Sequence, residues 1–140
     1  IIFKRFVLNE LLNDQNNITI IVDADCDKHG EDKDFVYASE MYDRVNYQGL
    51  ATYKQMASDL PSDKIFGEFI GLWKVNKQGA DMVHKALDTL AKHTDFKKMT
   101  CADLFNEIAK EGTIAVKYIR GAWLDVDTLM DFQNAGKLRL

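Results

Sequence analysis

Hydrophobic residues recur every three or four positions at the start of the chain and then merge into an unbroken run. The spacing over residues 2–13 predicts an amphipathic helix, which the polar turn NDQNN ends. The run ITIIVDAD at 18–25 is rich in β-branched residues, as is typical of a strand buried on both faces. The pattern therefore predicts a helix that leads into a central strand, with acidic residues where that strand reaches the edge of its sheet.

The middle of the chain mixes short apolar runs with glycines. FVYA at 35–38 and GLATYKQM at 49–56 could form short strands, and KIFGEFIGLWKV at 64–75 predicts a longer one. The longer run contains Gly67 and Gly71. Glycines inside a strand often mark the close approach of a ligand or of another backbone, so this strand is a candidate for lining a binding site.

Helical and strand-like patterns alternate through the second half of the chain. The predicted elements are two helices, a strand and a last helix, over 76–94, 100–112, 113–121 and 127–136. Asn76 can cap the first of these helices, and Thr100 with Asp103 three residues later can form a capping box for the second. The whole order predicts an α/β protein in which residues 1–140 form a single domain around a partly antiparallel sheet.

Composition and charge argue against several classes of function. The chain carries 18 basic and 22 acidic residues, whereas a protein that binds a nucleic-acid backbone usually presents a basic face. No apolar run is long enough to span a bilayer and no signal peptide is visible, so neither nucleic acid nor membrane is an expected partner. Cys26 and Cys101 lack CxxC spacing and are expected to be free thiols in the reducing cytoplasm.

Two carboxylates, Asp125 and Asp127, follow the strand predicted at 113–121. Open α/β sheets bind ligands just beyond strand ends, and Mg²⁺ usually takes one or two carboxylates together with substrate phosphate oxygens. The alternative is a polar helix start, because Thr128 and Asp131 form a T-x-x-D capping box and Asp127 could cap the helix instead. The pattern by itself favours capping, which explains one of the two carboxylates and leaves the other without a role.

Acidic residues also alternate at the end of the first predicted strand. Asp23, Asp25 and Asp27 have the spacing of a calcium loop, but Lys28 stands where such a loop requires glycine. Two interpretations remain. The segment is an acidic surface loop, or Asp23 and Asp25 line the same cleft as Asp125, where they would favour a cationic acceptor.

Glu68 lies between two glycines in an otherwise apolar strand. A glutamate in that setting is either partly buried, and then needs a partner, or faces water from an edge strand. The residue pattern leaves both interpretations open. No Ser-His-Asp arrangement and no glycine-rich phosphate loop stands out anywhere in the 140 residues.

Three stretches together resemble the nucleotidyltransferase domain that is fused to phosphoenolpyruvate mutase in phosphonate-making bacteria. They are IIFKRFVLNELL with ITIIVDAD near the start, GEFIGLWKV in the middle and YIRGAWLDVDTLMDFQNA near the end. The last is the most specific, because WLDVDT before a short helix is similar to the metal-bearing end of sugar-nucleotide and choline-phosphate nucleotidyltransferases. The resemblance implies a nucleotide-diphospho-sugar transferase-like fold, a layered α/β/α structure with a mixed sheet, of which this chain is the C-terminal portion.

The resemblance also implies an activity. A nucleoside triphosphate, with CTP favoured, would react with a phosphonate or phosphate acceptor to give a CMP-linked product and pyrophosphate. Asp127 and Asp125 match the position that binds the catalytic Mg²⁺, and Asp127 is the favoured of the two. The positions that match the acceptor side are Glu68, Gly71, Asp23 and Asp25.

The chain departs from that family on its nucleotide side. The glycine-rich nucleotide loop, and the Gly-Asp pair that supplies the other metal carboxylate, would fall before Ile1. This chain is therefore expected to supply the acceptor side and to be inactive alone. The alternatives are a non-catalytic interaction or regulatory module and a sugar-phosphate nucleotidyltransferase. A sheet short of strands would also expose its edges, which favours a homodimer.

Overall fold

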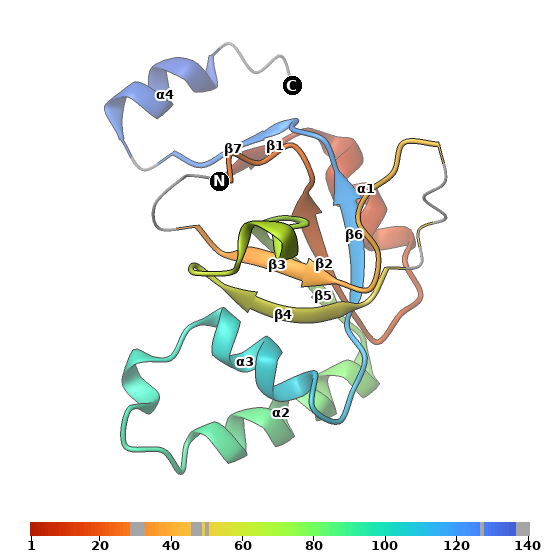
Figure 1. The fold of residues 1–140 in the computed structure, drawn as a ribbon, viewed down its shortest axis with the longest axis vertical. Helices are drawn as coiled ribbons and strands as arrows, with labels where there is room; N and C mark the ends of the chain where they lie inside the picture. The colour runs from red at the N-terminus through yellow and green to blue at the C-terminus, as the bar shows by residue number, and fades with distance from the viewer. Residues whose placement is uncertain (29–32, 46–48, 50, 127, 137–140) are drawn as a thin grey trace.

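The computed structural model describes residues 1–28, 33–45, 49, 51–126 and 128–136 (Figure 1). The strands are β1 (Ile2–Phe3), β2 (Ile18–Asp23), β3 (Phe35–Ala38), β4 (Tyr53–Ala57), β5 (Gly67–Val75), β6 (Ala115–Ile119) and β7 (Trp123–Leu124). The helices are α1 (Arg5–Asn13), α2 (Lys77–Leu90), α3 (Cys101–Ile108) and α4 (Leu129–Ala135), with short 3-10 turns at Ser62–Lys64 and Phe96–Lys98. The protein is a mixed α/β structure, as its sequence predicts.

β2 is the central strand of a five-stranded mixed sheet with the order β4-β3-β5-β2-β6. It pairs antiparallel with β5 and parallel with β6, and all six of its residues are buried. Antiparallel ladders join β5 to β3 and β3 to β4. The unbroken β-branched run at 18–23 therefore forms the doubly buried strand that its composition predicts.

The two ends of this sheet approach each other. Thr52, just before β4, forms an antiparallel bridge with Ala115 of β6. Next to it, the Val116 amide donates to the carbonyl of Ala51, and the Tyr53 amide donates to the carbonyl of Ile114, each at 2.9 Å. The sheet thus curls towards a barrel, and the chain itself covers part of the β6 edge, whereas the sequence predicts a sheet with exposed edges.

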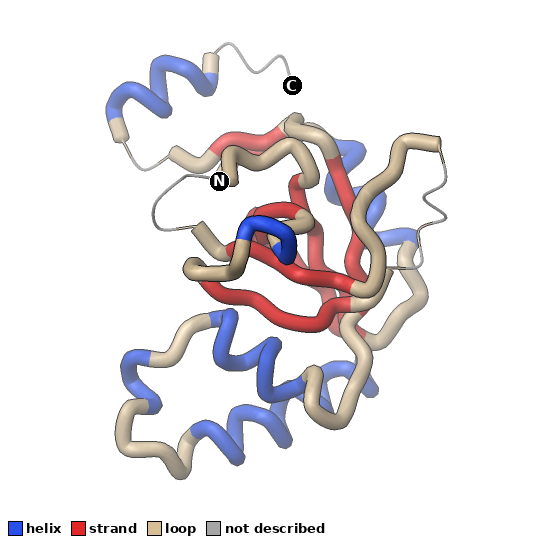
Figure 2. The backbone as a smooth tube through the Cα atoms, viewed as in Figure 1, coloured by secondary structure: helices blue, strands red, loops and turns tan. Residues whose placement is uncertain are grey.

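Alternate residues of β2 face opposite sides of the sheet, and a different helix layer covers each side. Ile20 packs in a core with Ala86 of α2 and Phe105 of α3. Ile21, its neighbour, packs in a second core with Val7 of α1. Figure 2 shows the helices around the strands accordingly, with α2 and α3 together at one end. This arrangement is compatible with the layered α/β fold expected from the sequence.

Phe105 of α3 is the centre of the larger core. Its side chain is fully buried and meets three aromatic rings edge-on, with centroid distances of 6.2 Å to Tyr53, 5.4 Å to Phe69 and 5.2 Å to Trp73. Edge-to-face contacts of this kind stabilise a core beyond the area that they bury. This one side chain of α3 therefore contacts both β4 and β5.

The chain begins with a strand, so the prediction of a helix from residue 2 was wrong at its start. Ile2 and Phe3 form β1, which pairs with β7, and α1 begins only at Arg5. Lys4 is extended, and its amide donates to the carbonyl of Ala122 at 2.9 Å. Tertiary pairing thus overrides the helical spacing of the first apolar residues, because its partner lies at the other end of the sequence.

The predicted caps of α2 and α3 are confirmed. The Asn76 side chain accepts the Gly79 amide, and Thr100 with Asp103 forms a capping box. Both helices end about four residues earlier than the sequence predicts, at Leu90 and Ile108. Among the described residues, no helix combines the length and the apolar character needed to cross a membrane.

Candidate functional site

Asp23 lies at the carboxyl end of β2, where it joins several elements. Its Oδ2 accepts the indole N–H of Trp123 at 2.7 Å. Its Oδ1 accepts the backbone amides of Gly121 and Asp25, each at 3.0 Å. The residue is only 6% exposed. A buried carboxylate with three donors is an anchor for the surrounding backbone, and its oxygens are already occupied by protein groups.

A sharp reversal after β6 brings Trp123 back to Asp23. Gly121 and Ala122 both adopt left-handed backbone conformations, with φ of 61° and 68°. Glycine takes this conformation without steric cost, whereas in alanine the Cβ comes too close to the following carbonyl oxygen. The reversal lets β7 pair with β1 and sets the start of the WLDVD segment at the tip of β2.

Asp25 and Arg120 form an ion pair beside this reversal. Arg120 Nε donates to both carboxylate oxygens of Asp25, at 2.9 and 3.0 Å. Both side chains are about half exposed, so the pair contributes little to stability and acts mainly to orient the guanidinium. Asp25 is thus engaged with a protein cation, whereas the sequence analysis considered it for a cationic acceptor.

Glu68 of β5 is opposite Asp23 in the sheet register and has a partner of its own. Lys33 Nζ lies 2.8 Å from Glu68 Oε2, and the Glu68 side chain is 13% exposed. Of the two interpretations of Glu68, the structure supports the partly buried one. Burial acts to lower the pKa of Lys33, but the hydrogen bond and charge of Glu68 outweigh it, so the pKa is raised.

The cysteine next to this pair is a free thiol, as expected. Cys26 is partly buried, and Cys101 is exposed. Burial raises the pKa of the Cys26 thiol, and the nearby charge of Glu68 adds to the effect. Cys26 is therefore held in its neutral, weakly nucleophilic form.

The two glycines of β5 are favoured at their positions for different structural reasons. A Cβ on Gly67 would come within 2.6 Å of the Asp23 carbonyl oxygen, so this glycine permits close approach of β2. Gly71 has φ of 81° in the stretch where the β2–β5 register shifts, and a Cβ there would meet no atom within 4 Å. Gly67 thus marks the approach of another backbone, and Gly71 marks a bulge with open space beside it.

The turn after β7 contains the predicted capping box, which Thr128 and Asp131 form. The Thr128 amide and hydroxyl donate to Asp131 Oδ2 at 2.9 and 2.6 Å, and the Asp131 amide donates back to Thr128 Oγ1 at 3.2 Å. This box caps α4, as predicted. Asp125 is not part of the cap, and its side chain is 62% exposed. Asp127 lies outside the described residues.

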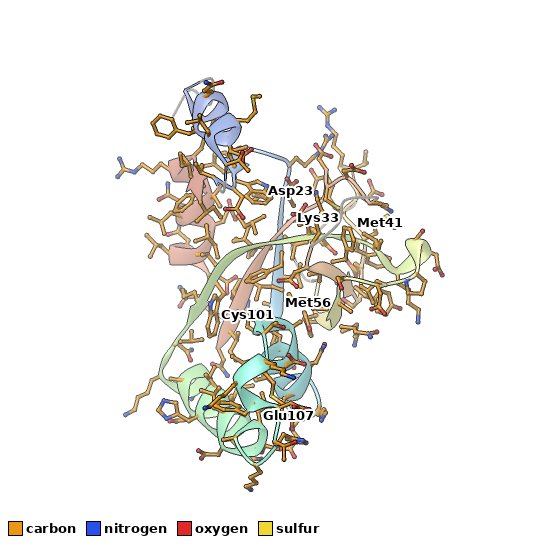
Figure 3. All side chains as sticks on the ribbon, turned by 90° about the vertical axis from the view of Figure 1, so that its left-hand side faces the viewer. Asp23, Lys33, Met41, Met56, Cys101 and Glu107 are labelled. Carbon is orange, nitrogen blue, oxygen red and sulfur yellow. The ribbon has the colours of Figure 1, made fainter. Side chains whose placement is uncertain are left out.

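The structure brings most of the predicted site residues to one end of the sheet. Asp23 and Glu68 are neighbours in register, Asp25 follows two residues after Asp23, and Asp125 follows two residues after the indole that Asp23 binds. In Figure 3, Asp23 and Lys33 lie at the same end of the molecule, away from Glu107 of α3. The described residues contain no group of three or more His, Cys, Asp or Glu that could hold a metal ion. Among the described carboxylates of the predicted site, Asp125 is the most exposed; its Oδ1 accepts the Val126 amide at 3.1 Å and lies 3.8 Å from the Ile1 ammonium.

A pocket of about 280 Å³ opens at this same end of the sheet. It is lined by Ala24, Asp25, Lys28, Met41, Tyr42, Arg44, Ile65, Phe66 and Arg120. The sequence does not predict its three basic residues as a site, because they come from separate loops and form no motif. A second pocket, of about 170 Å³, lies between α2 and α3 and includes none of the predicted site residues.

No protein-family model matches the chain. No curated protein matches it in sequence either.

Proposed function

We propose that this chain forms the acceptor side of a nucleotidyltransferase that acts in the cytoplasm. The enzyme would transfer a nucleotidyl group, from CTP by preference, to a phosphonate or phosphate acceptor and release pyrophosphate. The observation that carries the proposal is the contact of Asp23 with Trp123 and Gly121. This contact joins DAD to WLDV, and the β2–β5 register places GEFIG beside DAD. The three segments that carry the family resemblance therefore lie together at the carboxyl end of β2, and α/β sheets often bind ligands beyond the carboxyl ends of strands.

The proposed reaction is a single in-line displacement. An acceptor oxygen attacks the α-phosphorus, a new P–O bond forms, and the bond to the β-phosphate breaks so that pyrophosphate leaves with the electron pair. Mg²⁺, when bound, would neutralise the developing charge on the phosphates. Asp125 and Asp127 are its proposed ligands, together with substrate phosphate oxygens. Asp125 is exposed and outside the α4 cap, which fits such a role.

The remaining site residues have supporting roles in this proposal. Asp23 anchors the turn that carries Asp125, and Glu68 orders the loop at Lys33 through its ion pair. Gly71 leaves open space on the acceptor-facing strand. No glycine-rich phosphate loop stands out within these 140 residues, so the proposal assigns them only acceptor-side and metal-binding roles.

Two other functions stay open as alternatives. The missing phosphate loop favours a non-catalytic interaction or regulatory module built on the same half-domain. A sugar-phosphate nucleotidyltransferase would use the same carboxylates with a different acceptor. A homodimer is proposed in either case, although the bridge between Thr52 and Ala115 leaves less of the sheet edge open than the sequence predicts.

Pyrophosphate release by the longest natural protein that contains this sequence tests the proposal. Each of CTP, ATP, UTP and GTP is combined with methylphosphonate, phosphocholine or glucose 1-phosphate in the presence of Mg²⁺. We expect release with CTP and a phosphonate or phosphate acceptor, and a loss of orders of magnitude in Asp127→Ala with little change in Tm. Asp131→Ala, which breaks the α4 capping box and removes no proposed metal ligand, is the matched control. No release with any pair would favour the module, and release only with glucose 1-phosphate would favour the sugar-phosphate enzyme.

A further inference from the structure

The pocket beyond β2 and β6 is basic in an otherwise acidic protein. Among the described residues, its lining includes three cations, Lys28, Arg44 and Arg120, and one carboxylate, Asp25. The whole chain, in contrast, carries more acidic than basic residues, 22 against 18. Cations gathered in one concave site raise the local concentration of anions.

The basic groups of this pocket retain capacity to bind a ligand. Neither Lys28 nor Arg44 forms an ion pair with another described residue. Arg120 uses only its Nε in the pair with Asp25, so that pair leaves the two terminal NH₂ groups of the guanidinium unused. Asp25 holds Arg120 in position and cancels only one of the three positive charges.

The segment that carries Arg44 is fixed to the sheet. The Tyr118 hydroxyl of β6 donates to the carbonyl of Glu40 at 2.7 Å, and the Tyr118 ring meets Tyr42 edge-on at 6.1 Å. In Figure 3, Met41 of the same segment lies at the end of the molecule where Asp23 and Lys33 are found. The backbone just before Arg44 is thus held against β6, which lowers the entropy cost of binding a ligand there.

We propose that this pocket binds a tetrahedral phosphorus oxyanion, the phosphonate or phosphate group of the acceptor, with Arg44, Lys28 and Arg120 as ligands. A dianion with three oxygens can accept from three cations at once, and guanidinium groups match phosphate geometry with paired N–H donors. The identity of the ligand as an acceptor rests on the proposed function. The anion-binding property itself rests on the lining residues alone.

A direct titration of the 140-residue chain tests the pocket without any nucleotide. Methylphosphonate, inorganic phosphate and malonate are added separately at constant ionic strength, and amide chemical shifts are followed by NMR. We expect saturable shifts at Ala24, Tyr42 and Arg120 with both phosphorus oxyanions. Preference between methylphosphonate and phosphate identifies which of the two acceptor classes fits better.

Variants that each remove one positive charge show which residues bind the anion. Arg44→Gln should weaken methylphosphonate binding about tenfold or more, as loss of a charge-assisted hydrogen bond predicts, and Lys28→Gln should act in the same direction. Lys97→Gln removes an equal charge from the exposed 3-10 turn Phe96–Lys98, outside the pocket, and should change the dissociation constant less than twofold. An unchanged Tm in Arg44→Gln verifies that the variant is folded.

Several results would overturn the proposal. These are non-saturating shifts, equal affinity for malonate, or equal weakening by Lys97→Gln, which would indicate a general charge effect. Failure of the proposed function can be told apart from failure of the anion site. Saturable anion binding in a protein that releases no pyrophosphate would refute the enzymatic activity but support the anion-binding pocket. Full pyrophosphate release in Arg44→Gln would refute the pocket as the acceptor site and keep the enzyme.

Discussion

The indole N–H of Trp123 donates to the carboxylate of Asp23 across 2.7 Å, although the two residues lie 100 positions apart in the sequence. The bond connects the end of the central strand to the short strand β7 on the far side of the β6 reversal. Because the acceptor is a carboxylate, the hydrogen bond is charge-assisted and stronger than a neutral one, and Asp23 is almost fully buried.

Removal of this donor should destabilise the protein. Trp123→Phe keeps an aromatic ring but leaves Asp23 Oδ2 without its partner, and we expect a loss of about 1–3 kcal/mol in the free energy of unfolding. Urea denaturation followed by circular dichroism measures it. Asp125→Asn, at an exposed carboxylate of the same segment, is the control and should stay within about 0.5 kcal/mol of the wild type. Equal stability of the two variants would contradict the anchoring role of Asp23.

Ala122 offers a site for stabilisation. Its φ of 68° is costly for any residue with a Cβ, by roughly 1 kcal/mol. Ala122→Gly should therefore raise the free energy of unfolding by up to about 1 kcal/mol, reduced by the greater freedom of glycine in the unfolded chain. A rise in Tm by differential scanning calorimetry would verify this. A lower Tm would mean that the Ala122 methyl group makes compensating contacts.

Loss of the Glu68 charge should leave Lys33 without its partner. The lysine side chain is only 26% exposed, so we expect Glu68→Gln to cost about 1–2 kcal/mol in unfolding free energy. Glu111→Gln breaks the Lys85–Glu111 pair, in which both side chains are largely exposed, and should leave the stability unchanged. If both variants behave alike in chemical denaturation, the Glu68–Lys33 pair is no more than a surface contact.

The alkaline stability of the protein should depend on Tyr53. Burial, with the nearby charge of Asp34 adding to it, raises the pKa of Tyr53 well above its ordinary value of 10.0. The unfolded chain then loses the phenolic proton first as pH rises, so the unfolded state becomes favoured and stability falls above about pH 10. Tyr53→Phe should show a shallower decline of Tm between pH 9 and 11 than the wild type. Identical slopes would show that Tyr53 titrates normally.

The Asn106 side chain holds β4 to α3 and should be sensitive to substitution. Its Oδ1 accepts from the Tyr53 hydroxyl at 2.6 Å and the Met56 amide at 3.1 Å, and its Nδ2 donates to the Met56 carbonyl at 2.9 Å. Asn106→Leu would fill the space but leave all three groups unpaired, at a cost of about 2–4 kcal/mol. Denaturant titration measures the loss. Cys101→Ser, at an exposed residue of the same helix, controls for general changes in α3.

Sequence reasoning succeeded where local chemistry decides the structure. The apolar run of β2 is buried as predicted, and the boxes at Thr100–Asp103 and Thr128–Asp131 form because their partners are three residues apart. Each of these features depends on short-range spacing or on one strand's own composition. Such features are visible without knowledge of the tertiary fold.

The remaining features depend on partners that are distant in sequence. β1 was predicted as helix, because its pairing with β7 across the chain could not be inferred from two apolar residues. The engagement of Asp25 by Arg120, and of Glu68 by Lys33, likewise comes from tertiary contacts. The basic pocket was missed for the same reason, since Lys28, Arg44 and Arg120 carry no common spacing.

The parallel pairing of β2 with β6 sets an order of events during synthesis. β2 leaves the ribosome before β6, the strand that completes its second ladder and follows only after α3. Until then a β-branched segment whose one charged residue is Asp23 lacks its cover on one edge and resembles the sequences that nucleate cross-β aggregates. Nascent chains that stall before residue 115 should therefore depend on chaperones far more than chains released beyond residue 119.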